Sequence, residues 1–153
     1  MTAAKTMTIA DVMTKSVISI DAVMTINEAA KMMEDAKVGA IIVMENNKPV
    51  GIVTDRDFAV KVAAHAYQIS APVKQIMSFP LVSINSDETV RAAGDLMHDR
   101  KVRKLAVIDN GNVVGMITAT DIVNLLAVSV EEDMRDMYFH SVAKIYTNYS
   151  PYN

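Results

Sequence analysis

Apolar residues in the first half of the chain follow two periods, one typical of a helix and the other of strands. At helical spacing they predict one buried stripe, made of Ile26, Ala29, Ala30 and Met33. Thr25 and Glu28 stand at capping-box spacing where this helix would begin. Runs rich in β-branched residues at 17–20, 39–44 and 49–53 predict strands, and a polar turn joins the last two as a hairpin.

The same order of elements occurs twice in the sequence. Shifting the chain by 64 places lays residues 12–58 on residues 76–122 with 15 identities in 47 positions. The second hairpin has Asn110-Gly111 at its tip, and both residue types tolerate positive φ. The second stripe consists of Val90, Ala93, Gly94 and Met97. A final helix in each copy is expected to bury Phe58, Ala59 and Val62, or Ile122, Val123 and Leu126.

The repeat ends after Leu126, and residues 128–153 predict one more helix. Its apolar face is made of Met134, Met137, Tyr138, Val142 and Ile145. An isolated helix of this length is marginal in water, so the face must dock on something. Two alternatives stay open at this point: the helix covers the core of its own chain, or it contacts another subunit.

Composition narrows the classes of function. The chain is 51% hydrophobic and 22% charged, the balance of a soluble globular protein, and its net charge of -3 gives no overall positive field for nucleic acid or a membrane. Cysteine is absent, which excludes disulfides, thiol catalysis and cysteine-ligated metals. The longest apolar run, 38–44, is far shorter than the ~20 residues that a membrane span needs. With no apolar stretch near Met1 long enough for a signal peptide, a cytoplasmic location is expected.

Motifs of catalysis are missing from the sequence. The three histidines lack the spacing of a zinc-binding helix, and there is no phosphate loop, dinucleotide-binding loop or nucleophile elbow. We therefore expect no enzyme, no catalytic residues and no metal. The repeat-matched methionines, Met13, Met33, Met77 and Met97, are expected to fill the core.

Each copy ends its last strand with the motif Thr-x-x-Asp, as Thr54 with Asp57 and as Thr118 with Asp121. A helix start presents unpaired N–H groups and a positive dipole end, which favour a phosphate. The aspartate could accept both hydroxyls of a ribose. The plainer alternative is a capping box that only satisfies its own backbone, worth about 1 kcal/mol.

The largest difference between the copies is a basic run at the entry to the second hairpin. Residues 100–104 carry four positive charges, whereas the matching residues 36–40 carry one. Such a run could bind phosphate, or it could be an ordinary solvated face.

The order of these motifs resembles a tandem pair of cystathionine β-synthase (CBS) domains over about residues 8–126. The copies open with Val12-Met13-Thr14 and Ile76-Met77-Ser78, and they close with the segments Gly51–Asp57 and Gly115–Asp121. The resemblance implies an α/β (α+β) fold of two β-α-β-β-α repeats, packed about a pseudo-twofold axis with two clefts between them. It places the repeats at 8–66 and 72–127 and leaves a C-terminal helical extension at 128–153.

The resemblance also implies a regulatory sensor that needs no cofactor and binds an adenosine-containing effector such as AMP, ADP, ATP, NAD or S-adenosylmethionine. The first site is expected to contain Thr14, Lys15, Val17, Val38, Ala40, Thr54, Arg56, Asp57, Arg103 and Lys104. The second site is expected to contain Ser78, Leu81, Val102, Lys104, Thr118 and Asp121. In this scheme the aspartates bind ribose and the threonines line the phosphate side. The first site is favoured, because Arg103 or Lys104 could reach it.

The expected partners are a second copy of the chain, forming a homodimer, and a target protein of unknown identity. A competing hypothesis is a ligand-free interaction scaffold, in which the C-terminal segment contacts the partner and truncation after Val128 abolishes binding. A third hypothesis, single-stranded nucleic acid held by the basic run and the C-terminal tyrosines, conflicts with the negative net charge.

Overall fold

The sheet of the first repeat combines a parallel and an antiparallel strand pair. In the structure, a computed structural model that describes residues 7–128 and 132–147, β1 (Ser19–Asp21) runs parallel to β2 (Ala40–Glu45). β2 pairs in the antiparallel sense with β3 (Lys48–Thr54). The turn between them is tight because Asn46 and Asn47 take positive φ values of 51° and 60°. The predicted hairpin is confirmed, whereas the strand predicted at 17–20 begins at Ser19.

Helix α2 (Ile26–Ala36) has the predicted capping box. Thr25 Oγ1 accepts from the N–H of Glu28 at 3.1 Å, and the Glu28 carboxylate accepts from the N–H of Thr25 at 2.8 Å. Hydrogen bonds from the Thr25 backbone and hydroxyl hold the pKa of Glu28 below its usual range. Of the predicted stripe, Ala30 is only partly buried. The other stripe residues belong to the core cluster Ile20, Ala22, Ile26, Ala29, Met33, Ile41, Val43, Val53, Val73 and Ile76.

The final helix of the first repeat differs from the regular α-helix that was predicted. It starts as α3 (Asp55–Asp57) and continues as the π-helix η1 (Phe58–Ala64). Phe58 and Val62 pack only partly against the core, and Ala59 is exposed. The π-helical i→i+5 bonding shifts the residues away from the three- and four-residue spacing on which the predicted face depended. The connector predicted at 67–73 is a loop up to the short 3₁₀ helix η2 (Val73–Gln75).

The second repeat has the same order of strands and helices, but its last helix is a regular α-helix. Strands β4 (Ser83–Ile84), β5 (Lys104–Asp109) and β6 (Asn112–Thr118) form its sheet in that order, with β4 parallel to β5. The turn predicted at Asn110-Gly111 is confirmed by φ values of 51° and 81°. On helix α4 (Val90–Arg100) the whole predicted stripe is buried. On helix α5 (Ala119–Val128) Ile122 is buried as predicted, Val123 is exposed, and the side chain of Leu126 lies outside the described part.

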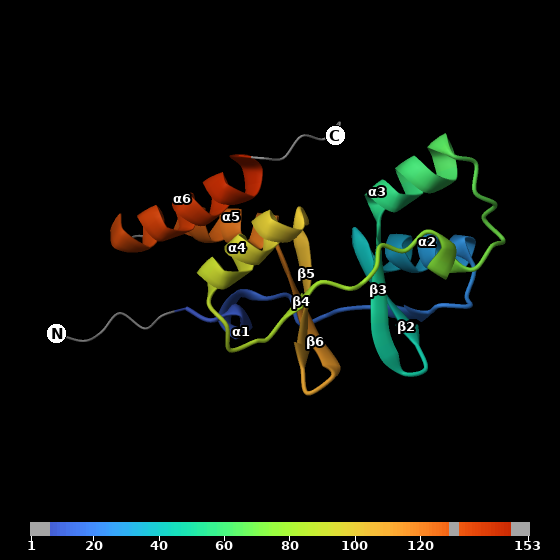
Figure 1. Cartoon of the computed structure of the whole chain (residues 1–153), viewed down its shortest axis with the longest axis horizontal. Coiled ribbons are helices and arrows are strands. Elements are labelled where there is room, and N and C mark those ends of the chain that lie inside the picture. Colours follow the sequence, from blue (N-terminus) through green and yellow to red (C-terminus); the bar gives the residue numbers. More distant parts are fainter. Residues whose placement is uncertain (1–6, 129–131, 148–153) are drawn as a thin grey trace. The chain divides into compact units, whose positions relative to one another are not determined.

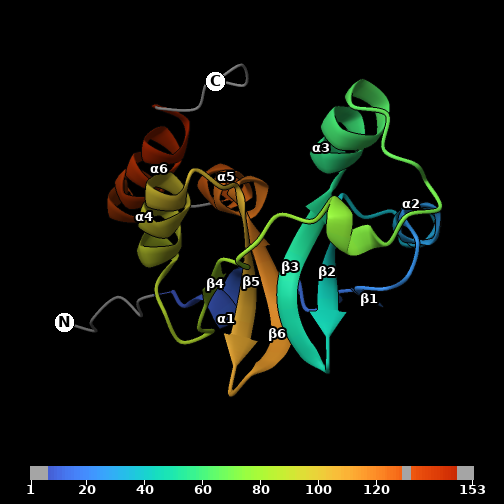
Figure 2. The same cartoon turned by 45° about the vertical axis from the view of Figure 1, so that its right-hand side comes forward.

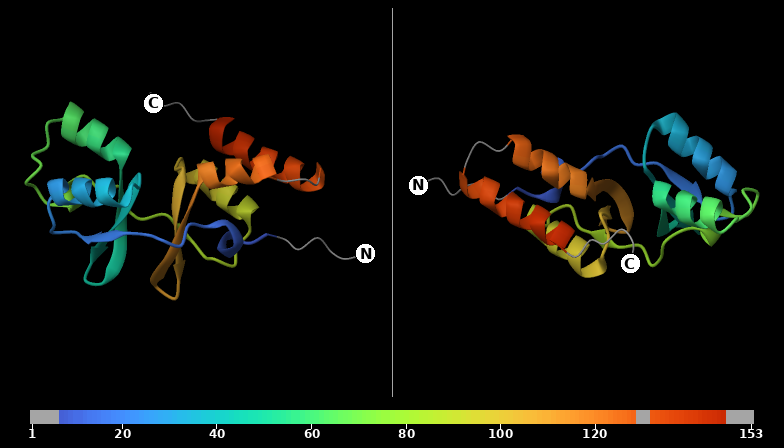
Figure 3. Two further views of the ribbon diagram at one scale, coloured as in Figure 1. Left: turned by 180° about the vertical axis from the view of Figure 1, so that it is seen from behind. Right: turned by 90° about the horizontal axis from the view of Figure 1, so that it is seen from above.

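The C-terminal helix α6 (Glu132–Thr147) packs against α4 and α5 (Figures 1 and 3). Its buried side chains are Tyr138, Ser141 and Ile145, and Val142 is partly buried. Lys144 anchors the helix to α4, since its Nζ lies 2.6 Å from Asp95 Oδ1 and its carbonyl oxygen 2.7 Å from His98 Nδ1. The side chains of Met134 and Met137 lie outside the described residues. Of the two alternatives for this helix, cover for the core of its own chain is confirmed.

The segment that opens each repeat pairs with the closing strand of the other repeat. Thr14 and Met116 exchange two backbone hydrogen bonds of 2.9 Å. Ser78 and Ile52 exchange the equivalent pair, of 2.8 and 3.1 Å. Both contacts put the backbone of the incoming segment directly over a glycine, Gly115 or Gly51. Helix α1 (Ile9–Val12) thus belongs with the second repeat and η2 with the first.

Two compact units result from this exchange. The first-repeat unit contains Ser16–Val82 and Asn110–Val113. The second-repeat unit contains residues 7–15, Ser83–Asp109 and the described residues from Val114 onward. In the second-repeat unit, helices α4, α5 and α6 gather beside the strands, as Figure 2 shows. Residues 8–15, 72–82 and 110–113 therefore belong to the contact unit of the other repeat and not to that of their own repeat.

Candidate functional site

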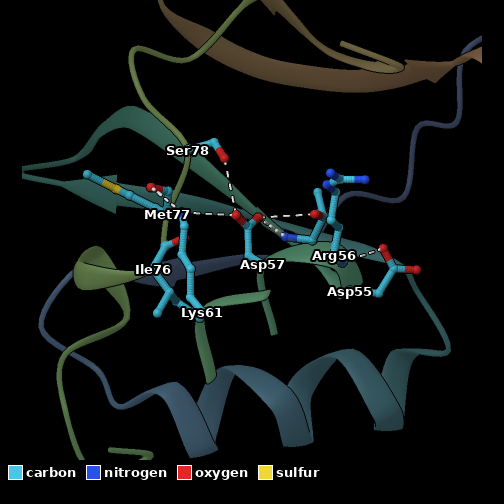
Figure 4. A network of polar contacts seen from close by, with 8 residues as sticks. Asp55, Arg56, Asp57, Lys61, Ile76, Met77 and Ser78 are labelled. Carbon is cyan, nitrogen blue, oxygen red and sulfur yellow. Dashed lines mark hydrogen bonds and ion pairs between the residues drawn. The ribbon is translucent and has the colours of Figure 1, made fainter. Parts of the chain in front are cut away.

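The junction between β3 and α3 carries the first Thr-x-x-Asp motif. The N–H and the hydroxyl of Thr54 both donate to Asp57 Oδ2, at 2.8 and 3.0 Å. The other oxygen, Asp57 Oδ1, lies 3.1 Å from Lys61 Nζ and accepts from Ser78 Oγ at 3.3 Å (Figure 4). Asp57 is only 8% exposed. This carboxylate is therefore buried and bonded by donors on both of its oxygens.

Lys61 is a residue of this junction that the sequence analysis missed, and the contact of Ser78 with Asp57 was not expected. Lys61 Nζ donates to the carbonyl oxygen of Ile76 at 2.6 Å and lies 3.4 Å from that of Met77 (Figure 4). Lys61 stands four residues after Asp57, so the i,i+4 charge spacing could have revealed it. Ser78 lies 21 residues from Asp57 and reaches it only through the chain exchange, for which the sequence gives no local signal.

Two further amides at the start of α3 also have partners within the chain. The N–H of Asp55 donates to the carbonyl oxygen of Gly39 at 3.3 Å. The N–H of Arg56 donates to Asp55 Oδ1 at 2.9 Å. The first junction thus satisfies much of its own hydrogen-bonding capacity.

The junction between β6 and α5 repeats the motif with fewer supporting side chains. The N–H and the hydroxyl of Thr118 both donate to Asp121 Oδ2 at 2.8 Å, and Thr118 Oγ1 accepts from the N–H of Asp121 at 3.2 Å. The N–H of Ala119 donates to the carbonyl oxygen of Arg103 at 2.9 Å. Within residues 7–128 and 132–147, no hydrogen bond or ion pair reaches Asp121 Oδ1. Asp121 is also more exposed than Asp57.

Sequence differences explain the contrast between the two junctions. With the shift of 64 places, Lys61 corresponds to Leu125 and Asp55 to Ala119. Neither replacement can supply a side-chain hydrogen bond. Both junctions contain the capping hydrogen bonds from threonine to aspartate, so the plainer alternative of the sequence analysis is present in each.

Thr14 and Ser78 each lie beside the closing strand of the other repeat. Ser78, expected with Asp121, donates to Asp57. Thr14, expected with Thr54 and Asp57, pairs with Met116, two residues before Thr118. These contacts arise because the opening segment of each repeat crosses to the other repeat. In the same way Leu81 belongs to the first-repeat unit and Lys15 to the second-repeat unit. The expected membership of Thr14 and Ser78 in the two ligand sites stays a prediction.

Of the other expected site residues, all except Arg103 and Lys104 of the first site lie in the same unit as their Thr-x-x-Asp motif. Val17, Val38 and Ala40 share the first-repeat unit with Thr54, Arg56 and Asp57. Val38 packs against the core cluster and Ala40 pairs with Thr54 in the β2–β3 ladder, so both also have a plain structural role. Val102, Arg103 and Lys104 share the second-repeat unit with Thr118 and Asp121. The reach of Arg103 or Lys104 to Thr54 stays a prediction.

In the described part of the chain, no three His, Asp or Glu side chains are grouped so as to hold a metal ion. None of the described helices has the length and apolar character needed to cross a bilayer.

Comparisons with known proteins agree with the repeat and with the fold. The family model of the CBS domain matches residues 9–64 and 73–128. The CBS domain-containing protein YhcV of Bacillus subtilis (strain 168) is 37% identical over 112 residues, which cover 73% of this chain and 80% of YhcV. A hexameric CBS-CP12 protein from bloom-forming cyanobacteria has a similar solved structure, with a TM-score of 0.75, 27% identity, and coverage of 87% of this chain and 77% of that one.

A structure with lower identity shows the same fold. The uncharacterized conserved protein from Pyrococcus horikoshii has a TM-score of 0.75 at 22% identity, over 84% of this chain and 98% of that chain. The matched residues cover both copies of the repeat. The chain therefore belongs to the CBS domain family, as a tandem pair of CBS domains.

Proposed function

We propose that this chain is a regulatory module that binds an adenosine-containing small molecule and passes its bound state to a partner protein. CBS-domain proteins are generally regulatory modules, which supports the first part of the proposal. AMP, ADP, ATP, NAD and S-adenosylmethionine are the candidate effectors. The homodimer and the identity of the target protein belong to the proposal as well.

The observation that carries the proposal is the repeated junction of strand, threonine, aspartate and helix. At Thr118 two donors fix one oxygen of the Asp121 carboxylate, and this leaves Oδ1 as an acceptor of known orientation. A carboxylate oxygen has lone pairs for two donors, and charge-assisted bonds of this kind are strong. Hydroxyls of a ribose supply such donors, and a helix start stabilises the phosphate that follows the ribose.

Regulation requires that the ligand prefer one arrangement of the protein over another. A ligand shifts such an equilibrium only by its differential affinity, and typical coupling free energies are about 1–3 kcal/mol. A shift of this size in the conformational equilibrium needs neither a large interface nor covalent chemistry. It suits a small module without catalytic motifs.

Thermal unfolding with a ligand panel tests the proposal. AMP, ADP, ATP, NAD and S-adenosylmethionine are each added to the full chain, and we expect at least one to raise the melting temperature. At 100 times the dissociation constant the added stability is about 2.7 kcal/mol. We expect Asp121→Asn to remove this ligand-induced rise, measured against the ligand-free variant. Asp99→Asn, on the exposed surface of α4, serves as the control and should keep it.

Flat melting curves across the panel would contradict the sensor and favour the ligand-free scaffold. One observation supports an interaction surface in either case. Large apolar side chains are exposed on the first-repeat unit, among them Val23, Ile69 and Phe79. Truncation after Val128 does not test the scaffold, because α6 buries Tyr138 and Ile145 in the core of its own unit. Loss of partner binding in the truncated chain could then result from unfolding of that unit.

A further inference from the structure

We infer that Lys61 closes the first junction, so that the effector binds at Thr118 and Asp121 and not at Thr54 and Asp57. This inference rests on the proposed function, because it selects between the two junctions of that function. The sequence analysis favoured the first junction because of the basic run at residues 100–104, and this inference favours the second junction instead. Lys61 then determines how many effector molecules one chain binds.

The acceptor capacity of Asp57 is used up within the protein. A carboxylate offers about four lone-pair positions. Thr54 fills two on Oδ2, through its N–H and its hydroxyl, while Lys61 and Ser78 fill two on Oδ1. A ribose at Asp57 would have to displace at least one of these donors.

Lys61 is equally saturated as a donor. An ammonium group has three protons. Its three acceptors are the carbonyl oxygen of Ile76 at 2.6 Å, Asp57 Oδ1 at 3.1 Å and the carbonyl oxygen of Met77 at 3.4 Å. The side chain is 31% exposed, so displacing the ammonium would leave partly buried groups without partners. The ammonium group of Lys61 therefore neutralises the Asp57 carboxylate and occupies one of its acceptor positions.

The surroundings of the first junction also disfavour a phosphate. The exposed Asp55 adds a second negative charge at the helix start and occupies the N–H of Arg56. A phosphate there would have to compete with Asp55 for that amide donor.

The second junction lacks the ammonium group, the extra carboxylate at the helix start and the serine hydroxyl that donates to the aspartate. Leu125 replaces the ammonium and Ala119 replaces Asp55. Among the described residues, Thr14, the counterpart of Ser78, makes no side-chain hydrogen bond to Asp121. Arg103 lies beside the helix start, since its carbonyl oxygen accepts from the N–H of Ala119 at 2.9 Å. Lys104 belongs to the same unit as Asp121.

Site-specific variants with AMP and ATP as probes test the choice of junction by calorimetry. We expect one site per chain in the wild type, a loss of at least tenfold in affinity for Asp121→Asn, and a change of less than twofold for Asp57→Asn. Lys61→Leu copies the residue of the second repeat and should add a second site. If Lys61→Leu does not fold, Lys61→Met keeps the length of the apolar stem. Loss of binding in Asp57→Asn with retention in Asp121→Asn would overturn the inference.

A second measurement needs no ligand and separates this inference from the proposed function. Acetylation by limiting acetic anhydride, mapped by mass spectrometry, should modify Lys61 at least fivefold more slowly than Lys74, whose side chain is 48% exposed. Asp57→Asn should accelerate the modification of Lys61, whereas Asp95→Asn, which removes the partner of Lys144, should not. Equal rates for Lys61 and Lys74 in the wild type would overturn the closure. Slow acetylation of Lys61 together with no nucleotide binding would refute the proposed function and leave the closure supported.

Discussion

Tyr138→Ala is expected to lower the free energy of unfolding by about 3–5 kcal/mol, the range for deleting a buried aromatic ring. The ring of Tyr138 is 0% exposed, and its hydroxyl lies 2.9 Å from Met7 Sδ. The substitution would leave a cavity where α6 meets the core of the second-repeat unit. Chemical denaturation with urea, monitored by circular dichroism, measures the change.

The adjacent aromatic residue supplies the matched control. Phe139 lies on the same helix but is 66% exposed, so Phe139→Ala should change stability by less than about 0.5 kcal/mol. Burial, with the charge of Asp11 adding to it, raises the pKa of Tyr138. Equal effects of the two alanine substitutions would show that α6 does not complete this core.

Gly51→Ala is expected to destabilise the first-repeat unit by about 1–3 kcal/mol, the usual cost of overpacking. A Cβ at Gly51 would lie 2.7 Å from Met77 Sδ and 2.9 Å from the carbonyl oxygen of Ser78. Met77 can move, but the Ser78 carbonyl belongs to the backbone pair with Ile52. We expect amide hydrogen exchange at Ile52 and Ser78 to accelerate in the variant.

The hairpin of the other repeat offers a glycine that should tolerate substitution. Gly111 has nothing within 4 Å of an added Cβ, and Asn47 occupies the equivalent turn position with a φ of 60°. Gly111→Asn should therefore change stability by less than about 0.5 kcal/mol. If Gly51→Ala were as mild as this control, the incoming segment could not lie against β3 as the structure has it.

Elements with strong local signals were predictable from the sequence. The stripes of α2 and α4, the capping box of Thr25 and the turn at Asn110 all depend on residues close together in the chain. The π-helix η1 was not predictable, because the spacing of Phe58 and Val62 fits a regular helix equally well. Ala59 and Val123 are exposed, so the buried faces predicted for the last helix of each repeat were too wide.

The chain exchange marks the limit of sequence reasoning about the site. Duplication revealed both Thr-x-x-Asp motifs, because equivalent residues recur at the same shift. The local contacts of those motifs were not predictable, because Thr14 pairs with Met116 and Ser78 with Ile52 through long-range backbone pairing. The basic run pointed to the first junction, whereas the contacts of Lys61, identified only in the structure, point to the second.

A crystal structure of the protein grown with AMP tests the central claim most directly. The account predicts AMP at the start of α5, with its ribose hydroxyls within hydrogen-bond distance of Asp121 Oδ1 and with Lys61 still bound to Asp57. A ribose bound to Asp57 with Lys61 displaced would contradict the choice of junction. Both helix starts without nucleotide at saturating AMP would contradict binding of AMP at these motifs.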